Sequence, residues 1–480
     1  MLFNSIDFAL FLPVVFAAYW ALKKDLRAQN FLIVVASYVF YGWWDYRFLA
    51  LLFFSTLTDF VIGLKMQTSE GDRRKLLLWV SIITNLGFLG FFKYYNFFVD
   101  NFITAFTFFG SPIKPNTLDI ILPVGISFYT FQTLSYTIDV YKRKLEPTKD
   151  FVAFCAFVSF FPQLVAGPIE RATNLLPQFY TKRTFDYSKA VDGMRQILWG
   201  LFKKIVIADN CAYFANQIFN NSESYGGSTL LLGAVFFALQ IYGDFSGYSD
   251  IAIGTSRLFG FSLMRNFAYP YFSRDIAEFW RRWHISLSTW FRDYLYIPLG
   301  GSRGGKWMRV RNTFIIFIVS GFWHGANWTF IVWGALNAAY FLPLLLAGKN
   351  RTNLGTVAEG RLLPSVKDVV QIGVTFGLTT LAWIFFRAEN ITHAISYCSE
   401  MLSLTLFTIP HVPSAKQAVL TIILVVFFMI IEWIGREEPY AISKLGLRWS
   451  KPVRWSFYYG LAMVIFFFSN SENEFIYFQF

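Results

Sequence analysis

The chain has 480 residues, of which 55% are hydrophobic, 21% aromatic and only 15% charged. A soluble globular domain carries about 25% charged residues, so this composition and its repeated apolar runs exclude a soluble protein and indicate a polytopic membrane protein. The net charge of +12 would suit nucleic-acid binding, but the basic residues gather at alternate ends of successive apolar runs. This is the pattern of cytoplasmic loops, and it accounts for the charge without nucleic acid.

Twelve apolar segments are predicted to be helices, because a backbone that meets lipid must satisfy its own hydrogen bonds. In chain order they are residues 3–22, 29–46, 48–64, 76–98, 118–140, 190–215, 229–256, 311–326, 327–346, 367–386, 417–434 and 454–469. We expect an all-α polytopic membrane protein with about 11–12 transmembrane helices. The polar stretches between the helices are too short for a core of their own, so residues 1–480 are interpreted as a single membrane domain.

The distribution of basic residues predicts the orientation. Most lie on one side, including all those in the segment 257–311, whereas the other side holds only Arg47, Lys93, Lys114, Arg387 and Lys416. The basic side is expected in the cytoplasm. The amino terminus, the loop 216–228 and the tail 471–480 are then expected outside the cytoplasm. Residues 1–22 lack a signal-peptide pattern and are expected to remain as the first span.

Two further segments are predicted to insert without crossing. Residues 151–168 are apolar but are interrupted by Pro162, Gly167 and Pro168, which favours a re-entrant hairpin. Residues 276–298 have the pattern of one amphipathic helix. Its aromatic face consists of Trp280, Trp283, His284, Leu287, Phe291 and Tyr294. On its own, His284 would also suit an ordinary interfacial helix.

One histidine lies deep in an apolar run. His324 follows Arg311 by thirteen residues. At about 1.5 Å per helical residue, that spacing places the imidazole roughly 20 Å into a hydrocarbon layer about 30 Å thick. An ionisable group at this depth is costly and faces the protein interior or a wet cavity. The position favours a functional histidine, although buried structural histidines also occur.

Polar residues also interrupt the segment 229–256. Asp244, Ser246, Ser249 and Asp250 fall in the run Tyr-Gly-Asp-Phe-Ser-Gly-Tyr-Ser-Asp. A nucleophilic serine would need a G-x-S-x-G turn after a strand, and this context lacks both. The side chains either bond to neighbouring helices or line a polar cavity.

A glycine-rich basic turn spans Gly300 to Lys306. It formally fits part of a phosphate loop, but Trp307 occupies the position of the magnesium-binding Ser or Thr, and no strand precedes the turn. Nucleotide hydrolysis is therefore excluded. The turn is either a flexible connector or a contact for phosphates of a bound cofactor.

The remaining chemistry rests on the two histidines. The three cysteines lie far apart, and neither a metal-ligand spacing nor a carboxylate pair accompanies the histidines, so we expect no metal. A histidine with a pKa near neutral can act as a general base toward a hydroxyl. Attack of a hydroxyl on an activated acyl group is the simplest reaction that needs only a general base.

A transporter with an intramembrane proton relay is the alternative function. Its expected repeat symmetry and matched broken helices are not found in the sequence.

Several long motifs resemble the membrane-bound O-acyltransferase family. They are ILPVGISFYTFQTLSYTIDVY (121–141), FFPQLVAGPIER (160–171), YGDFSGYSDIAIG (242–254), EFWRRWHISLSTWFRDYLYIPLGG (278–301) and SGFWHGANWTF (320–330). The similarity is dense from about residue 118 to 346 and is nearest to the bacterial branch that acts in alginate O-acetylation. The branch that D-alanylates teichoic acids is a relative.

The resemblance implies a ring of helices around a thin centre, with a cytoplasmic funnel for the acyl donor and an outer funnel for the acceptor. It implies that His324 is the catalytic histidine and His284 a second active-site residue. Donor contacts are then expected at Arg281, Arg282, Trp283, Gly304 and Lys306, and the substrate cavity at Asp244, Ser246, Ser249, Trp323 and Asn327.

The resemblance also implies a reaction and its partners. The acetyl group would come from acetyl-CoA or another acyl thioester, as a co-substrate and not as a bound cofactor. It would pass outward across the bacterial inner membrane to O-acetylate an exported polysaccharide such as alginate, through an extracytoplasmic acetyltransferase. D-alanyl transfer to a cell-wall polymer is the alternative within the family. Membrane lipid is the remaining expected partner, and nucleic acid is not expected.

Overall fold

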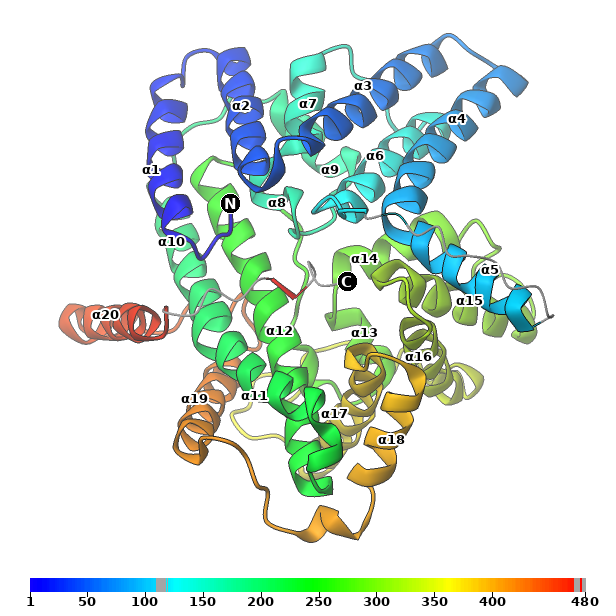
Figure 1. Ribbon diagram of the computed structural model, residues 1–480. Coiled ribbons are helices and arrows are strands. Elements are labelled where there is room, and N and C mark those ends of the chain that lie inside the picture. The colour runs from blue at the N-terminus through cyan, green and yellow to red at the C-terminus, as the bar shows by residue number, and fades with distance from the viewer. Residues whose placement is uncertain (109–117, 119, 470–474, 477–480) are drawn as a thin grey trace. The chain divides into compact units, whose positions relative to one another are not determined.

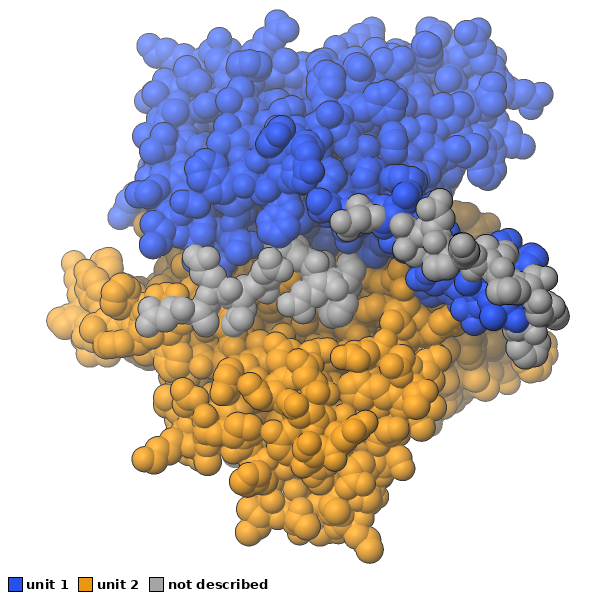
Figure 2. Space-filling view, viewed as in Figure 1, with its two compact units in different colours: residues 1–190, 255–264 blue, residues 191–254, 265–480 orange. Residues whose placement is uncertain are grey.

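The computed structural model describes residues 1–108, 118, 120–469, 475 and 476. Within these residues the secondary structure is helical, without strands. The chain forms two compact units, which Figure 2 colours separately: residues 1–190 with 255–264, and residues 191–254 with 265–480. The predicted all-α class is confirmed, and the helices are labelled in Figure 1.

The first unit contains the amino-terminal helices. They are α1 (Ile6–Ala21), α2 (Leu26–Asp45), α3 (Phe48–Gln67), α4 (Gly71–Leu89), α5 (Tyr95–Phe108), α6 (Ile126–Tyr141), α7 (Phe151–Ser159), α8 (Phe161–Leu164) and α9 (Ala172–Leu175). The predicted hairpin at 151–168 is a broken helical segment, because α7 ends at Ser159 and the separate short helix α8 contains Pro162. Phe160 between the two helices is fully buried.

Helices α3, α4 and α6 pack together around a buried carboxyl group. The Asp59 carboxylate accepts hydrogen bonds from the Ser81 hydroxyl (2.6 Å) and the Asn85 amide (2.9 Å). The Thr133 hydroxyl in turn donates to the Asn85 amide oxygen (3.1 Å). A polar group among apolar helices is tolerated when it is hydrogen-bonded, so this cluster links three helices.

The second unit contains the two longest α-helices of the described residues, Gly227–Leu258 and Val366–Arg387, and the candidate residues His284 and His324. Its helices are α10 (Tyr187–Leu201), α11 (Asp209–Asn220), α12 (Gly227–Leu258), α13 (Ile276–Arg282), α14 (Ile285–Phe291), α15 (Lys306–His324), α16 (Trp328–Leu346), α17 (Val366–Arg387), α18 (Ile391–Met401), α19 (Ala415–Ile434) and α20 (Lys451–Phe468). The first four residues of α10 and the last four of α12 belong to the first unit.

Helices occupy all twelve predicted apolar segments, although the segment 118–140 becomes helical only at Ile126. Six described stretches are long and apolar enough to cross a membrane: α3, Gly71–Thr107, α12, α16, α17 and α19. This confirms a multi-pass membrane protein. The count of 11–12 spans stays a prediction.

Buried ion pairs connect α12 to the π-helical turn between α10 and α11. This turn, Phe202–Ala208, contains two consecutive buried lysines. Lys203 Nζ lies 2.5 Å from Asp250 Oδ2, and Lys204 Nζ lies 2.9 Å from Asp244 Oδ1. The backbones approach closely here, since a Cβ on Gly200 would lie 2.6 Å from the Gly247 carbonyl oxygen.

The prediction of one amphipathic helix over 276–298 is wrong. Helix α13 ends at Arg282, Trp283 is extended, and His284 has a left-handed backbone with φ 41° before α14 begins. The reason is the neighbouring segment 266–268, which bonds to the backbone on both sides of the break. The Ala268 N–H donates to the Arg282 carbonyl (3.0 Å) and the Ile285 N–H donates to the Asn266 carbonyl (2.9 Å). These bonds replace helical ones, so side-chain periodicity no longer decides the backbone.

Candidate active site

The break between α13 and α14 positions His284. Its imidazole is almost fully buried, with 1% of the residue exposed. Asn266 links this turn to α12: its carbonyl accepts from the Ile285 N–H, its side-chain oxygen accepts from the Ser286 hydroxyl (2.5 Å), and its side-chain amide donates to the Ser249 hydroxyl (3.1 Å). This polar network connects the histidine's turn to α12 and makes the left-handed conformation tolerable.

His324 is the last residue of α15, and its position depends on the pairing of α15 with α16. These two helices pack against each other over much of their length. A Cβ on Gly321 would lie 2.1 Å from the Phe330 carbonyl oxygen, so only glycine permits this approach. Beyond the turn, the Asn327 side chain caps α16 by accepting from the Thr329 N–H (3.0 Å). The tight hairpin therefore fixes the buried imidazole of His324.

Trp323 lies between the two histidines. Its ring centroid is 6.1 Å from that of His284 and 4.8 Å from that of His324. Other aromatic rings enclose the pair: Phe245 contacts His284, while Trp333 and Phe386 contact His324 at centroid distances of 5.2 and 5.3 Å. The structure thus brings together two histidines that are forty residues apart in sequence.

Burial makes the His284 imidazole a weak base. Burial lowers the pKa of His284 to about 3, so this ring is neutral near pH 7. A neutral ring can orient a partner by hydrogen bonding.

A large cavity opens beside the histidines. Its volume is about 620 Å³, within the usual range for ligand sites. Its lining residues include Ser288 and Ser320, each four positions from a histidine. The Ser288 N–H donates to the His284 carbonyl (3.0 Å), and Ser320 lies one helical turn before His324 on α15. The cavity therefore extends to within about a helical turn of both histidines.

The cavity wall combines aromatic and cationic side chains. Trp280, Phe291, Tyr296, Phe317 and Phe341 are its aromatic residues, and Arg281, Arg292, Arg309 and Arg351 are its basic residues. An apolar chamber with several guanidinium groups suits an elongated ligand that carries anionic groups. Sequence reasoning identified Arg281 but not Arg292, Arg309 or Arg351. Their only signal was that each lies in a basic segment assigned to the cytoplasmic side.

The other predicted donor contacts are not among the residues that line this cavity. Arg282 bonds to Glu278 and to backbone carbonyls. Trp283 is buried against Phe279 and Trp383. Gly304 and Lys306 lie between the cavity residues Ser302 and Arg309, at the start of α15. Donor contact by these residues remains a prediction.

The predicted substrate-cavity residues have different environments. The Asp244 carboxylate pairs with Lys204 and accepts from the Ile476 N–H (2.6 Å). Ser246 and Ser249 line a small cavity of about 20 Å³, together with Lys203, Asp250 and Glu432. Trp323 separates the histidines, and Asn327 caps α16. The two lysines within the apolar run 190–215 were the overlooked sequence signal for this charged cluster.

Comparison with known proteins identifies the family of the chain. Residues 142–382, which contain both histidines, match the sequence profile of MBOAT, the membrane-bound O-acyltransferase family. The chain is 40% identical over 445 residues to the protein named probable alginate O-acetylase AlgI of Pseudomonas aeruginosa, covering 92% of this chain and 82% of that protein.

Two further relatives align over essentially their whole length. The protein named probable alginate O-acetylase AlgI of Pseudomonas putida is 38% identical over 504 residues, covering 100% of both chains. The peptidoglycan O-acetyltransferase of Helicobacter pylori is 33% identical over 528 residues, covering 100% of this chain and 98% of that protein. With a profile match over half of its residues and relatives this similar over nearly all of them, the chain belongs to the membrane-bound O-acyltransferase family and is an O-acyltransferase.

Proposed function

We propose that this protein moves an acetyl group from a cytoplasmic thioester, acetyl-CoA in the first place, to O-acetylate an exported polysaccharide such as alginate. The observation that supports this proposal best is the basic, aromatic cavity that ends near two buried histidines. Thioester donors of this kind have an acyl end and an anionic end, which matches the apolar depth and the arginines of the cavity.

In the proposed reaction His324 is the general base. Its imidazole takes the proton of the acceptor hydroxyl as that oxygen attacks the thioester carbonyl. The new C–O bond forms, the C–S bond breaks, and the protonated imidazole returns the proton to the leaving thiolate. Trp323, Trp333 and Phe386 surround the ring and keep water away, which limits hydrolysis of the donor.

The proposed acceptor lies outside the cytoplasm. The hydroxyl belongs to the polymer itself or to an extracytoplasmic acetyltransferase that completes the modification. Relatives named for alginate and for peptidoglycan acetylation favour acetyl transfer to an exported glycan. Transfer of D-alanine is the alternative outcome of the test that follows.

Inside-out inner-membrane vesicles provide that test. The vesicles contain the full-length protein and receive either labelled acetyl-CoA or a labelled D-alanyl thioester at their exposed cytoplasmic face. The expected result is label on the glycan or on an acetyltransferase inside the vesicle, from acetyl-CoA only. Label from the D-alanyl donor alone would contradict the proposal, and so would an unchanged acetyl content of the exported polymer in cells that lack the protein.

Orientation provides a second prediction. We propose an inner-membrane protein with an extracytoplasmic amino terminus, so Ser224, in the turn between α11 and α12, faces the outside. In Ser224→Cys, a membrane-impermeant thiol reagent should label whole cells once the outer membrane is made permeable. Ser302→Cys, in the basic turn before α15, is the cytoplasmic control. Labelling of Ser302→Cys but not of Ser224→Cys would reverse the orientation.

A third prediction concerns His284. Because His284 is neutral and packs beside Trp323, we expect it to support the reaction without being the principal base. His284→Ala should lower acetylation by less than the roughly 10²–10⁴-fold expected for loss of a general base. Acetyl content at matched protein level measures the effect. Wild-type acetylation in this variant would assign the residue a purely structural role.

A further inference from the structure

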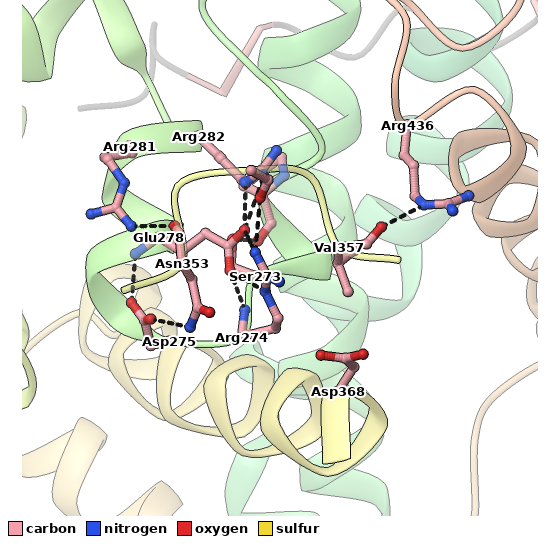
Figure 3. Close-up of polar contacts among 12 residues, drawn as sticks. Ser273, Arg274, Asp275, Glu278, Arg281, Arg282, Asn353, Val357, Asp368 and Arg436 are labelled. Atoms are coloured by element: carbon pink, nitrogen blue, oxygen red, sulfur yellow. Dashed lines mark hydrogen bonds and ion pairs between the residues drawn. The ribbon is translucent and has the colours of Figure 1, made fainter. Parts of the chain in front are cut away.

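The segment after α16 contains residues 350–358, which form no helix and yet are held firmly by arginine side chains. We call these residues the clamped loop. Arg281 Nη1 donates to the Asn350 carbonyl (2.8 Å) and Arg281 Nη2 donates to the Asn353 carbonyl (2.7 Å). The Asn353 side chain donates to Asp275 Oδ2 (2.6 Å), as Figure 3 shows. One arginine of α13 thus spans two carbonyls of the loop.

A buried carboxylate orients two more arginines, which bond to the same loop. Glu278 is 1% exposed and accepts from Arg274 Nε and Arg282 Nε, both at 3.0 Å. Arg274 Nη2 and Arg282 Nη2 each donate to the Gly355 carbonyl at 2.8 Å. Glu278 therefore fixes two guanidinium groups, which converge on one backbone oxygen.

The far end of the clamped loop is held from a different helix. Arg436, which follows α19 and is 5% exposed, donates through Nε to the Val357 carbonyl (2.9 Å) and through Nη2 to the Ala358 carbonyl (2.6 Å). Figure 3 shows this contact on the opposite side of the loop from Arg281. A polar loop that would otherwise be mobile is thus anchored at both ends.

The clamped loop forms part of the cavity beside the histidines. Its residues Asn350 and Arg351 line that cavity, together with Arg281 itself. Of the other two cavity arginines, Arg292 pairs with Asp293 (2.7 Å). Among the described residues, neither Arg309 nor Arg351 forms an ion pair. These two guanidinium groups are therefore available to a ligand.

We propose that the clamped loop is a fixed wall of the donor site, that Arg351 binds a phosphate group of a pantetheine-type thioester, and that Glu278 and Arg281 are positioning residues that act through the loop. This inference rests on the proposed function, because it assigns the anionic end of the donor to this cavity. A diphosphate or phosphodiester fits a guanidinium by paired hydrogen bonds. Pantetheine without phosphate lacks this partner.

Binding to the purified full-length protein in detergent tests Arg351 without requiring turnover. The probes are CoA, dephospho-CoA and pantetheine, and the variants are Arg351→Ala and the control Arg361→Ala. Arg361 lies just beyond the clamped loop and outside the cavity lining. Loss of a charge-assisted contact should weaken CoA binding by about tenfold or more in Arg351→Ala, with pantetheine unchanged. A loss with CoA but not with dephospho-CoA assigns the contact to the 3′-phosphate, and an equal loss with both assigns it to the phosphates that remain.

Variants of Arg281 distinguish a positioning role of this side chain from direct binding of the ligand by its charge. Lysine keeps the positive charge but cannot span the Asn350 and Asn353 carbonyls as the planar guanidinium does. If Arg281 acts through the loop, Arg281→Lys and Arg281→Ala weaken CoA binding equally and raise KM for acetyl-CoA more than they lower kcat. Glu278→Gln should have the same effect. Because loss of the buried Glu278 carboxylate also affects folding, Glu278→Gln is interpreted only together with Arg281→Lys.

Three results would overturn the inference: unchanged CoA binding in Arg351→Ala, equal losses with CoA and pantetheine, or wild-type binding in Arg281→Lys. Its failure is separable from failure of the proposed function. If acetylation requires His324 but CoA affinity is independent of Arg351, the function stands and the inference falls. If Arg351 governs CoA affinity but His324→Gln still acetylates, the loop assignment stands without that mechanism.

Discussion

Cells that contain His324→Gln or His324→Ala should export polymer without detectable acetylation, while the protein accumulates in the membrane at near wild-type levels. His324 is 4% exposed and ends α15 among Trp323, Trp333 and Phe386. Substrate and donor can therefore meet its ring only inside the protein. Removal of a general base costs about 10²–10⁴-fold in rate, which is enough to reduce polymer acetylation below detection.

The two His324 substitutions test different explanations of the same loss. Glutamine keeps a polar side chain of similar length in the aromatic enclosure, so its loss of activity reports the missing proton acceptor. Alanine additionally leaves a space beside Trp333 and Phe386. The control is His411→Gln, which changes an exposed histidine before α19. Acetyl content per unit of exported polymer, at matched protein level, is the measurement. Normal acetylation in His324→Gln would end the base assignment.

Loss of the Lys204 amine should have the largest effect on stability. Lys204 Nζ lies 2.9 Å from both Asp209 Oδ1 and Asp244 Oδ1, and all three side chains are buried. Lys204→Met keeps the length of the side chain but leaves two carboxylates without their cation. Removal of one member of a buried ion pair costs about 3–5 kcal/mol in the free energy of unfolding.

Thermal unfolding of the detergent-purified protein measures this effect. We expect a clearly lower Tm for Lys204→Met and a partial recovery when Asp244→Asn removes one of the unpaired charges. Lys416→Met, at the exposed start of α19, is the matched control and should leave the Tm unchanged. A wild-type Tm for Lys204→Met would show that the buried charges are neutralised in another way.

The sequence alone determined the class of protein and most of its helices. Long apolar runs predict helices because a backbone in lipid has no other way to satisfy its polar groups, and helices occupy all twelve predicted segments. The depth of His324 in one such run marked it as a candidate without knowledge of any neighbour. Five long motifs, two of which contain His284 and His324, indicated the family, and the family profile matches residues 142–382. These features are local, so they can be read along the chain.

The hydrophobic periodicity was misleading where a segment from elsewhere in the sequence forms hydrogen bonds to the backbone of a predicted helix. Residues 276–298 have helical periodicity, but Asn266 and Ala268 bond to the backbone around Trp283 and His284 and interrupt the helix there. Arg281 was expected to contact the donor, and the structure adds that its guanidinium holds the carbonyls of Asn350 and Asn353. The partner of a long polar side chain depends on which backbone groups the fold brings within reach.

The cavity and the charged cluster were decided by tertiary structure alone. Arg281, Arg292, Arg309 and Arg351 come from four separate segments and meet only because α13 to α16 pack around one space. Lys203 and Lys204 appeared as two basic residues in an apolar run, and only the close approach to α12 supplies the carboxylates that neutralise them. Periodicity and composition predict which face of its own helix a residue occupies and whether the helix is apolar. The identity of its partners requires contacts between residues far apart in the chain.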